Sequence, residues 1–138
     1  MAEIFWSSIR IYFHILFILE PKECCSKVGL VGAHQTKLNQ NYTKENELVN
    51  DMPYYVDNEK RYGIWFDPSW LEWNIGFLSD EDALLYTSEF VECPSDANDW
   101  KEYFDGEWNI NLNATLSGTN LNATDYSKWR KYSGSRFE

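Results

Sequence analysis

The stretch that decides the fold is RYGIWFDPSWLEWNIGF, residues 61–77. Large apolar side chains alternate with other residues over positions 62–66 and again over 73–77, and a Pro68-Ser69 turn lies between the two runs. Alternation at a period of two is typical of strands that bury one face, so the stretch predicts the two strands of a β-hairpin. We expect the rest of the chain to extend or cover this hairpin.

Short apolar runs bounded by turn residues continue the pattern on both sides, and they predict strands at 27–32, 52–56, 83–87, 100–104 and 107–110. The first of these runs suits an edge strand. Asp105-Gly106 separates the last two runs and predicts a second hairpin, because a tight hairpin turn needs positive φ at its centre.

These patterns predict an all-β fold, a small antiparallel meander of five to seven short strands, closed or partly closed as a barrel, with one disulfide. The length of 138 residues suits one domain, and the aromatic fraction of 17% can fill a compact core. We expect this aromatic-rich domain to span residues 25–112. Beyond it Asn, Thr, Ser and Gly dominate, so residues 113–138 are predicted to form a flexible tail.

The first residues differ from the rest in composition. Residues 11–19 are an apolar stretch preceded by Arg10, which is typical of a secretory signal peptide and too short to span a bilayer. We therefore predict a leader over residues 1–24, a secreted protein, and no membrane insertion once the leader is cleaved. An uncleaved leader that acts as an anchor is the alternative.

Cysteines and glycosylation motifs fit the same compartment. An odd count of three cysteines leaves one outside any single bridge. We assign the bridge to Cys25 and Cys93, with Cys24 as the alternative partner of Cys93; the closed loop of about 70 residues is worth several kcal/mol in the chain-entropy model. Asn-x-Thr acceptors for N-glycans occur at Asn41, Asn113 and Asn122.

Charge and motifs argue against several functions. The net charge is −10 and no cluster of Lys or Arg precedes residue 113, so nucleic acid and anionic membranes are disfavoured as partners. No hydrolase, phosphate-binding or zinc-protease motif occurs, and the cysteines with His34 lack the C-x-x-C spacing of a zinc site. We predict no catalytic residues, no cofactor and no metal.

The order of several aromatic motifs carries a resemblance to a known family. These are MPYYV at 52–56, YGIWF at 62–66, WNIG at 73–76, Cys93-Pro94, Trp100 and GEW at 106–108. Together they resemble an aromatic-rich repeat of animal extracellular proteins with the form G-R-P-x-Y, Y-L-Y-W, W-x-I-G, C-P, W and G-x-W. Residues 50–52 depart from the repeat, which has Asn-Gly-Arg there. The resemblance implies an interaction module without catalytic chemistry.

The expected function is a secreted, non-catalytic binding or adhesion module for an extracellular protein. Trp70 falls in the connection after Pro68, out of phase with both strands, where a rigid aromatic side chain can anchor a partner. The alternative is a lectin-like domain, in which a glycan stacks on Trp70. The remaining residues of this candidate surface, which would bind sugar hydroxyls, are Asp67, Glu72 and Asn74. The other tryptophans expected to fill the core are Trp65, Trp73, Trp100 and Trp108.

Overall fold

The computed structural model describes residues 23–119, which form one antiparallel sheet of nine strands. The strands are β1 (Lys27–Val31), β2 (Asn41–Lys44), β3 (Tyr55–Asp57), β4 (Tyr62–Asp67), β5 (Glu72–Phe77), β6 (Asp82–Thr87), β7 (Trp100–Phe104), β8 (Glu107–Asn111) and β9 (Thr115–Thr119). Two short 3-10 helices lie in the connections, η1 (Thr36–Leu38) and η2 (Pro94–Asp96).

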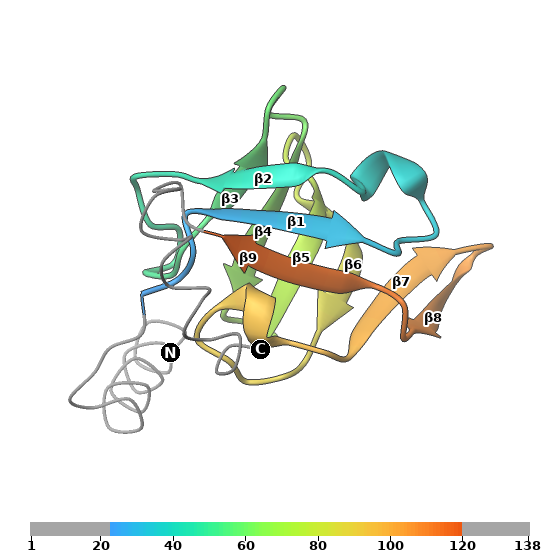
Figure 1. Cartoon of the computed structure of the whole chain (residues 1–138). Coiled ribbons are helices and arrows are strands. Elements are labelled where there is room, and N and C mark those ends of the chain that lie inside the picture. Colours follow the sequence, from blue (N-terminus) through green and yellow to red (C-terminus); the bar gives the residue numbers. More distant parts are fainter. Residues whose placement is uncertain (1–22, 120–138) are drawn as a thin grey trace, which may run out of the picture.

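The sheet is a meander that curls into a half-barrel. Its strand order is β8-β7-β6-β5-β4-β3-β2-β1-β9, so each strand from β1 to β8 pairs with its neighbours in sequence. The curl brings β1, β2 and β9 in front of β4, β5 and β6, and the β7–β8 hairpin projects from one end (Figure 1). The all-β meander is confirmed, although with nine strands rather than five to seven.

The hairpin predicted from residues 61–77 is the centre of this sheet. β4 and β5 pair from Tyr62 opposite Phe77 to Asp67 opposite Glu72, across a four-residue turn that ends in Leu71 at a φ of 56°. The alternating apolar side chains face the concave side, where Ile64, Phe66, Trp73 and Ile75 are fully buried. The period of two therefore decided both the strands and the face that they bury.

Two tyrosines extend the core from the hairpin to the start of the chain. Tyr42 of β2 and Tyr55 of β3 are fully buried, and each places its hydroxyl against a backbone carbonyl at 2.7 Å, of Leu38 and Cys25 respectively. Burial raises the pKa of both hydroxyls, and for Tyr42 the Asp57 carboxylate adds to the shift. Each tyrosine thus fills the core with its ring and fixes a loop with its hydroxyl.

Two strands lie where no strand was predicted. β2 contributes one apolar side chain, Tyr42, among polar residues, and β9 contributes mainly Leu116. Because β9 pairs with β1 along its whole length, β1 is not an edge strand. The expected end of the domain at residue 112 is therefore wrong, and residues 113–119 belong to the sheet. The rest of the predicted tail, with Asn122, and residues 1–22 of the predicted leader lie outside the described residues.

The disulfide joins Cys24, rather than Cys25, to Cys93, with a Cα–Cα distance of 5.4 Å. Neighbouring side chains of an extended chain point to opposite sides. Cys24 is buried and faces Cys93, whereas the Cys25 side chain lies over Gly118 of β9, where any Cβ would come within 2.5 Å of the Cys25 sulfur. Cys24 is thus part of the folded domain, which corrects the leader boundary placed after residue 24.

A buried carboxylate closes the curl between β7 and the loop after β1. The Glu102 side chain is fully buried and accepts the backbone N–H groups of His34 and Gln35, both at 2.7 Å. The Asn111 amide of β8 donates to Glu102 at 2.8 Å and to the Gly32 carbonyl at 3.0 Å. Bonds of this kind to a charged acceptor are about twice as strong as neutral ones, which offsets the cost of burying the carboxylate.

Removing the disulfide is expected to cost about 4 kcal/mol of unfolding free energy, because the closed loop no longer restricts the unfolded chain. The change is the double variant Cys24→Ala with Cys93→Ala, measured by urea denaturation. Cys25→Ser is the matched control and should leave the disulfide intact in a non-reducing peptide map. A Cys25–Cys93 peptide in the wild-type map would contradict the assignment.

Glu102→Gln is expected to lower the unfolding free energy by about 2–3 kcal/mol, because an amide NH₂ then faces a backbone N–H donor and the acceptor charge is lost. Glu107→Gln, at an exposed position of the same hairpin, is the control and should change stability by less than about 0.5 kcal/mol. Equal denaturation midpoints for the two variants would show that the Glu102 carboxylate does not close the sheet.

Candidate functional site

The expected binding residues divide between the surface and the interior. Trp70 lies in the β4–β5 turn with 72% of its surface exposed. Asp67 and Glu72, which flank the turn, are half-buried on the convex face of the sheet. Asn74 is buried, so it does not form an exposed surface with Trp70 as expected.

Asp67 and Glu72 form a pair of like charges across the turn. Partial burial, followed by the neighbouring Asp67 carboxylate, raises the pKa of Glu72, and Lys101 offsets part of the shift. Asp67 accepts the backbone N–H of Ser69 at 2.9 Å, which fixes the direction of its carboxylate. The convex face is therefore acidic at this end of β4 and β5.

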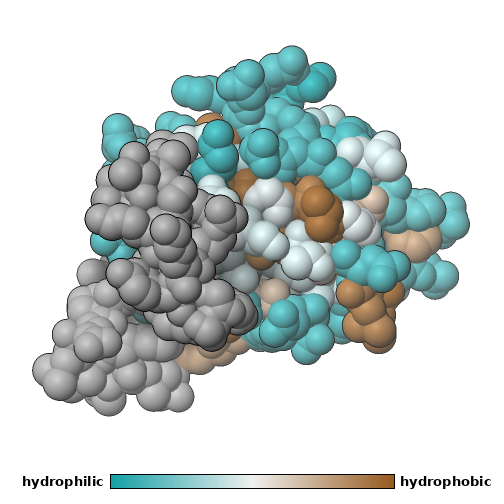
Figure 2. Space-filling model, in the orientation of Figure 1, coloured by the Kyte–Doolittle hydropathy of each residue, from teal (hydrophilic) through white to brown (hydrophobic). Residues whose placement is uncertain are grey.

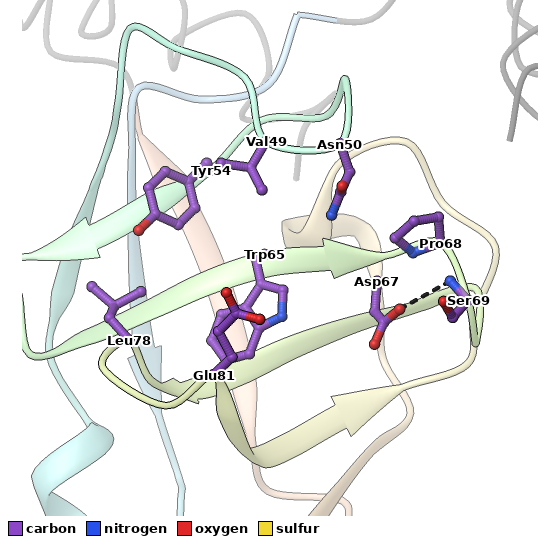
Figure 3. Close-up of a pocket in the computed structure, with 9 residues that line it drawn as sticks. All are labelled: Val49, Asn50, Tyr54, Trp65, Asp67, Pro68, Ser69, Leu78 and Glu81. Carbon is purple, nitrogen blue, oxygen red and sulfur yellow. Dashed lines mark hydrogen bonds between the residues drawn. The ribbon is translucent and has the colours of Figure 1, made fainter. Parts of the chain in front are cut away.

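A hollow of about 410 Å³ opens beside Asp67 on the same face. Trp65 forms its centre, with Tyr54 and Leu78 on one side and Asp67, Pro68 and Ser69 on the other (Figure 3). Its remaining lining residues are Val49, Asn50 and Glu81. Trp65 was expected in the core; it is buried instead on the convex face, beneath the loops that frame this hollow.

Local backbone geometry builds the walls of the hollow. Leu78 folds over Gly63, where an added Cβ would come within 2.4 Å of the leucine side chain and within 2.9 Å of the Tyr55 carbonyl oxygen, so a side chain at this position would displace its neighbours. Asn50 and Asp51 both have positive φ, at 56° and 65°, as a two-residue type I′ turn requires. The Asn50 amide donates to the Phe66 carbonyl at 2.9 Å, which holds this turn over β4.

The hollow combines aromatic surface with acceptors and donors of hydrogen bonds. Among residues 23–119, its two carboxylates are those of Asp67 and Glu81, and no Lys or Arg lines it. Partial burial, with Glu45 and Glu81 nearby, raises the pKa of the Tyr54 hydroxyl, so this group stays protonated. Such a lining suits an uncharged or cationic ligand and disfavours an anion.

A second surface lies on the β7–β8 hairpin, and sequence reasoning missed it. Four large apolar side chains are exposed there, namely Tyr103, Trp108, Ile110 and Leu112, the last two at 72% and 78%. Figure 2 shows an apolar group at the base of β8 in an otherwise mainly polar face. Trp108 was expected in the core, but it is 43% exposed because it shares the convex face with Tyr103, which lies opposite it in register.

Aromatic contacts hold this surface in place. Trp108 packs edge-on against Tyr86 and Tyr103, with ring centroids 4.8 and 5.3 Å apart. The Lys101 ammonium lies 5.6 Å from the centre of the Tyr86 ring. A hollow of about 510 Å³ next to these rings is lined partly by Tyr86, Ile110 and Leu112. Aromatic side chains that pack against one another keep one conformation even where they are exposed. A rigid aromatic surface of this kind suits binding.

β8 is also an end strand of the sheet as far as residues 23–119 extend. Asp105 and Gly106 have φ values of 55° and 79°, as in a type I′ turn, which confirms the predicted Asp-Gly hairpin. In an antiparallel pair, residues whose backbone groups bond the partner strand alternate with residues whose groups point away from it. The N–H and C=O groups of Glu107, Asn109 and Asn111 therefore point toward β7. The N–H and C=O groups of Trp108 and Ile110 consequently point to the outer edge.

Other classes of site find little support in the described part of the chain. No group of three or more His, Cys, Asp and Glu side chains in residues 23–119 could hold a metal ion. His34 stacks on Phe104 with ring centroids 4.0 Å apart, and Cys93 is in the disulfide. No helix within these residues is long and apolar enough to cross a lipid bilayer.

The predicted glycan acceptors within the described residues are both exposed. Asn41 lies on β2 and Asn113 in the connection between β8 and β9.

Comparison with known proteins gives no family for this fold and these surfaces: no protein-family model, no curated protein and no solved structure matches the chain.

Proposed function

We propose that this chain is a secreted, non-catalytic binding module that engages an extracellular protein through the β7–β8 surface. The observation that carries the proposal is the exposure of Tyr103, Trp108, Ile110 and Leu112 on and beside an end strand. Large exposed apolar side chains that gather at one place are typical of interaction sites, whereas isolated ones are common on any surface. Tryptophan and tyrosine are also enriched among residues that dominate binding energy.

The partner segment is an extended chain that pairs with the outer edge of β8, which no strand within residues 23–119 covers. The outward backbone groups of Trp108 and Ile110 supply the hydrogen bonds of strand addition, and their side chains on the convex face supply apolar contacts. The net charge of −10 attracts a basic partner over distances comparable to the Debye length. We therefore expect apolar residues in the partner to alternate with Lys or Arg.

Several features support the secretory route. A disulfide between Cys24 and Cys93 is typical of an oxidising compartment. Asn41 and Asn113 are exposed and stand in acceptor motifs, and residues 11–19 have the composition of a leader. The resemblance to the aromatic-rich extracellular repeat favours the same reading.

Selection of random nine-residue peptides on phage against the full chain tests the binding surface. Peptides with alternating apolar and basic residues are expected, and Trp108→Ala or Ile110→Ala should weaken their affinity at least about tenfold, because each removes a central contact. Leu48→Ala is the matched control, since Leu48 is 62% exposed but lies before β3, and it should leave affinity unchanged.

Methylation of the central peptide nitrogens tests the binding mode, because an N-methyl group blocks the ladder hydrogen bonds and leaves the side chains in place. Binding should then be lost. Peptides that bind Trp108→Ala and Ile110→Ala as tightly as the wild-type chain, or a selection without binders, would refute the proposal.

Export is expected to leave N-glycans on Asn41 and Asn113. Peptide mapping of the full chain, produced in a secretory host and treated with an N-glycosidase in heavy-oxygen water, should show the deamidation label at both positions. Asn41→Gln and Asn113→Gln should each remove one labelled peptide. Exported protein that lacks both labels would contradict glycosylation, and retention of the chain in the cytosol would contradict secretion.

A further inference from the structure

We infer that the hollow around Trp65 is a binding site for a single neutral sugar residue, such as the end of a glycan. This site uses none of the residues of the β7–β8 surface and does not depend on the protein interaction proposed above. The alternative drawn from the sequence placed sugar recognition on a surface of four residues, namely Trp70, Asp67, Glu72 and Asn74. Of these, Trp70, Glu72 and Asn74 lie outside the hollow, which shares only Asp67 with that earlier set.

The shape of the hollow suits one pyranose ring. Its volume is about 410 Å³, within the range of small-ligand pockets, and it is open to solvent on one side. Trp65 and Tyr54 supply aromatic surface from two different segments, with Leu78 beside them (Figure 3). Apolar faces of this kind can pack on the C–H face of a sugar ring.

A donor that is open to solvent points to the class of ligand. No acceptor within residues 23–119 bonds the Trp65 indole N–H, and its nitrogen is not among the buried atoms of these residues that lack a partner, so solvent reaches it. Its nitrogen lies on the side of the ring that faces Asp67 (Figure 3). A ligand with an acceptor oxygen at this position can bond this N–H in place of solvent.

The other polar groups of the hollow need donors as well as acceptors from the ligand. The Asp67 and Glu81 carboxylates accept hydrogen bonds, while the hydroxyls of Tyr54 and Ser69 can do either. A sugar hydroxyl donates one hydrogen and accepts others, so adjacent hydroxyls can satisfy the Trp65 N–H and a carboxylate together. A tetramethylammonium cation offers no acceptor to the indole N–H, and an anionic sugar meets two carboxylates with no Lys or Arg among the lining residues within 23–119.

The test is a glycan array that displays neutral and sialylated or sulfated terminal sugars, probed with the full exported chain. The methyl glycoside of the strongest neutral hit is then titrated by calorimetry, with tetramethylammonium as the cationic probe. We expect a neutral sugar to bind and tetramethylammonium not to bind. Asp67→Asn and Trp65→Phe should each weaken the glycoside about tenfold, since each removes one hydrogen bond to the sugar.

Matched variants separate this site from its neighbours and from loss of fold. Trp70→Ala and Trp108→Ala should leave glycoside affinity unchanged. Trp65→Phe changes a buried side chain and can lower the melting temperature. Asp67→Asn should not unfold the turn, because it keeps an acceptor for the Ser69 N–H. Glu81→Gln lies on an exposed turn, so these two variants test the site without loss of fold.

Three results would overturn the inference. The first is an array without neutral hits for chain that has its Cys24–Cys93 disulfide. The second is a glycoside affinity that Asp67→Asn, Glu81→Gln and Trp65→Phe leave unchanged, and the third is binding of tetramethylammonium or of anionic sugars in place of neutral ones. The peptide selection with Trp108→Ala is read independently, so failure of the sugar site and failure of the protein surface give different outcomes.

Discussion

The Glu102 carboxylate is the contact on which the shape of the sheet depends. Pairing between successive antiparallel strands does not by itself bring the two ends of a meander together, and besides the Cys24–Cys93 disulfide this sheet uses a polar contact to do so. Glu102 on β7 supplies that connection by accepting the N–H groups of His34 and Gln35, while Asn111 adds the Gly32 carbonyl. His34 stacks on Phe104 in the same place. The β7–β8 hairpin is thereby fixed relative to the loop after β1.

The two sides of the curled sheet differ in the residues that they carry. The concave side holds the aromatic core, and the disulfide ties the segment before β1 to the residue that precedes η2, which packs against β9. The convex side carries both the hollow around Trp65 and the β7–β8 surface. One row of cross-strand neighbours joins them, in the order Trp65, Asn74, Tyr86, Lys101 and Ile110. The two surfaces proposed above to bind a glycan and a protein therefore lie on one continuous face.

Sequence patterns predicted the elements in which apolar periodicity and turn chemistry agree. The β4–β5 and β7–β8 hairpins are in this group, because alternation and the Pro68-Ser69 and Asp105-Gly106 turns point to the same strands. β2 and β9 escaped prediction because each buries few apolar side chains; backbone pairing with β1 and β3 holds them instead. Backbone pairing of this kind is hard to detect from amino-acid composition, because polar residues form ladder hydrogen bonds as readily as apolar residues do.

The sequence by itself determined an all-β meander, its central hairpin, the need for a disulfide to Cys93 and the turn that exposes Trp70. These follow from interactions between residues close in the chain, or from the chemistry of a residue type. The tertiary structure decided that Cys24 is the partner of Cys93, that Glu102 is buried, and that Trp65 and Trp108 lie on the convex face. Those outcomes depend on which distant segments the curl brings together, and no local pattern of residues specifies that.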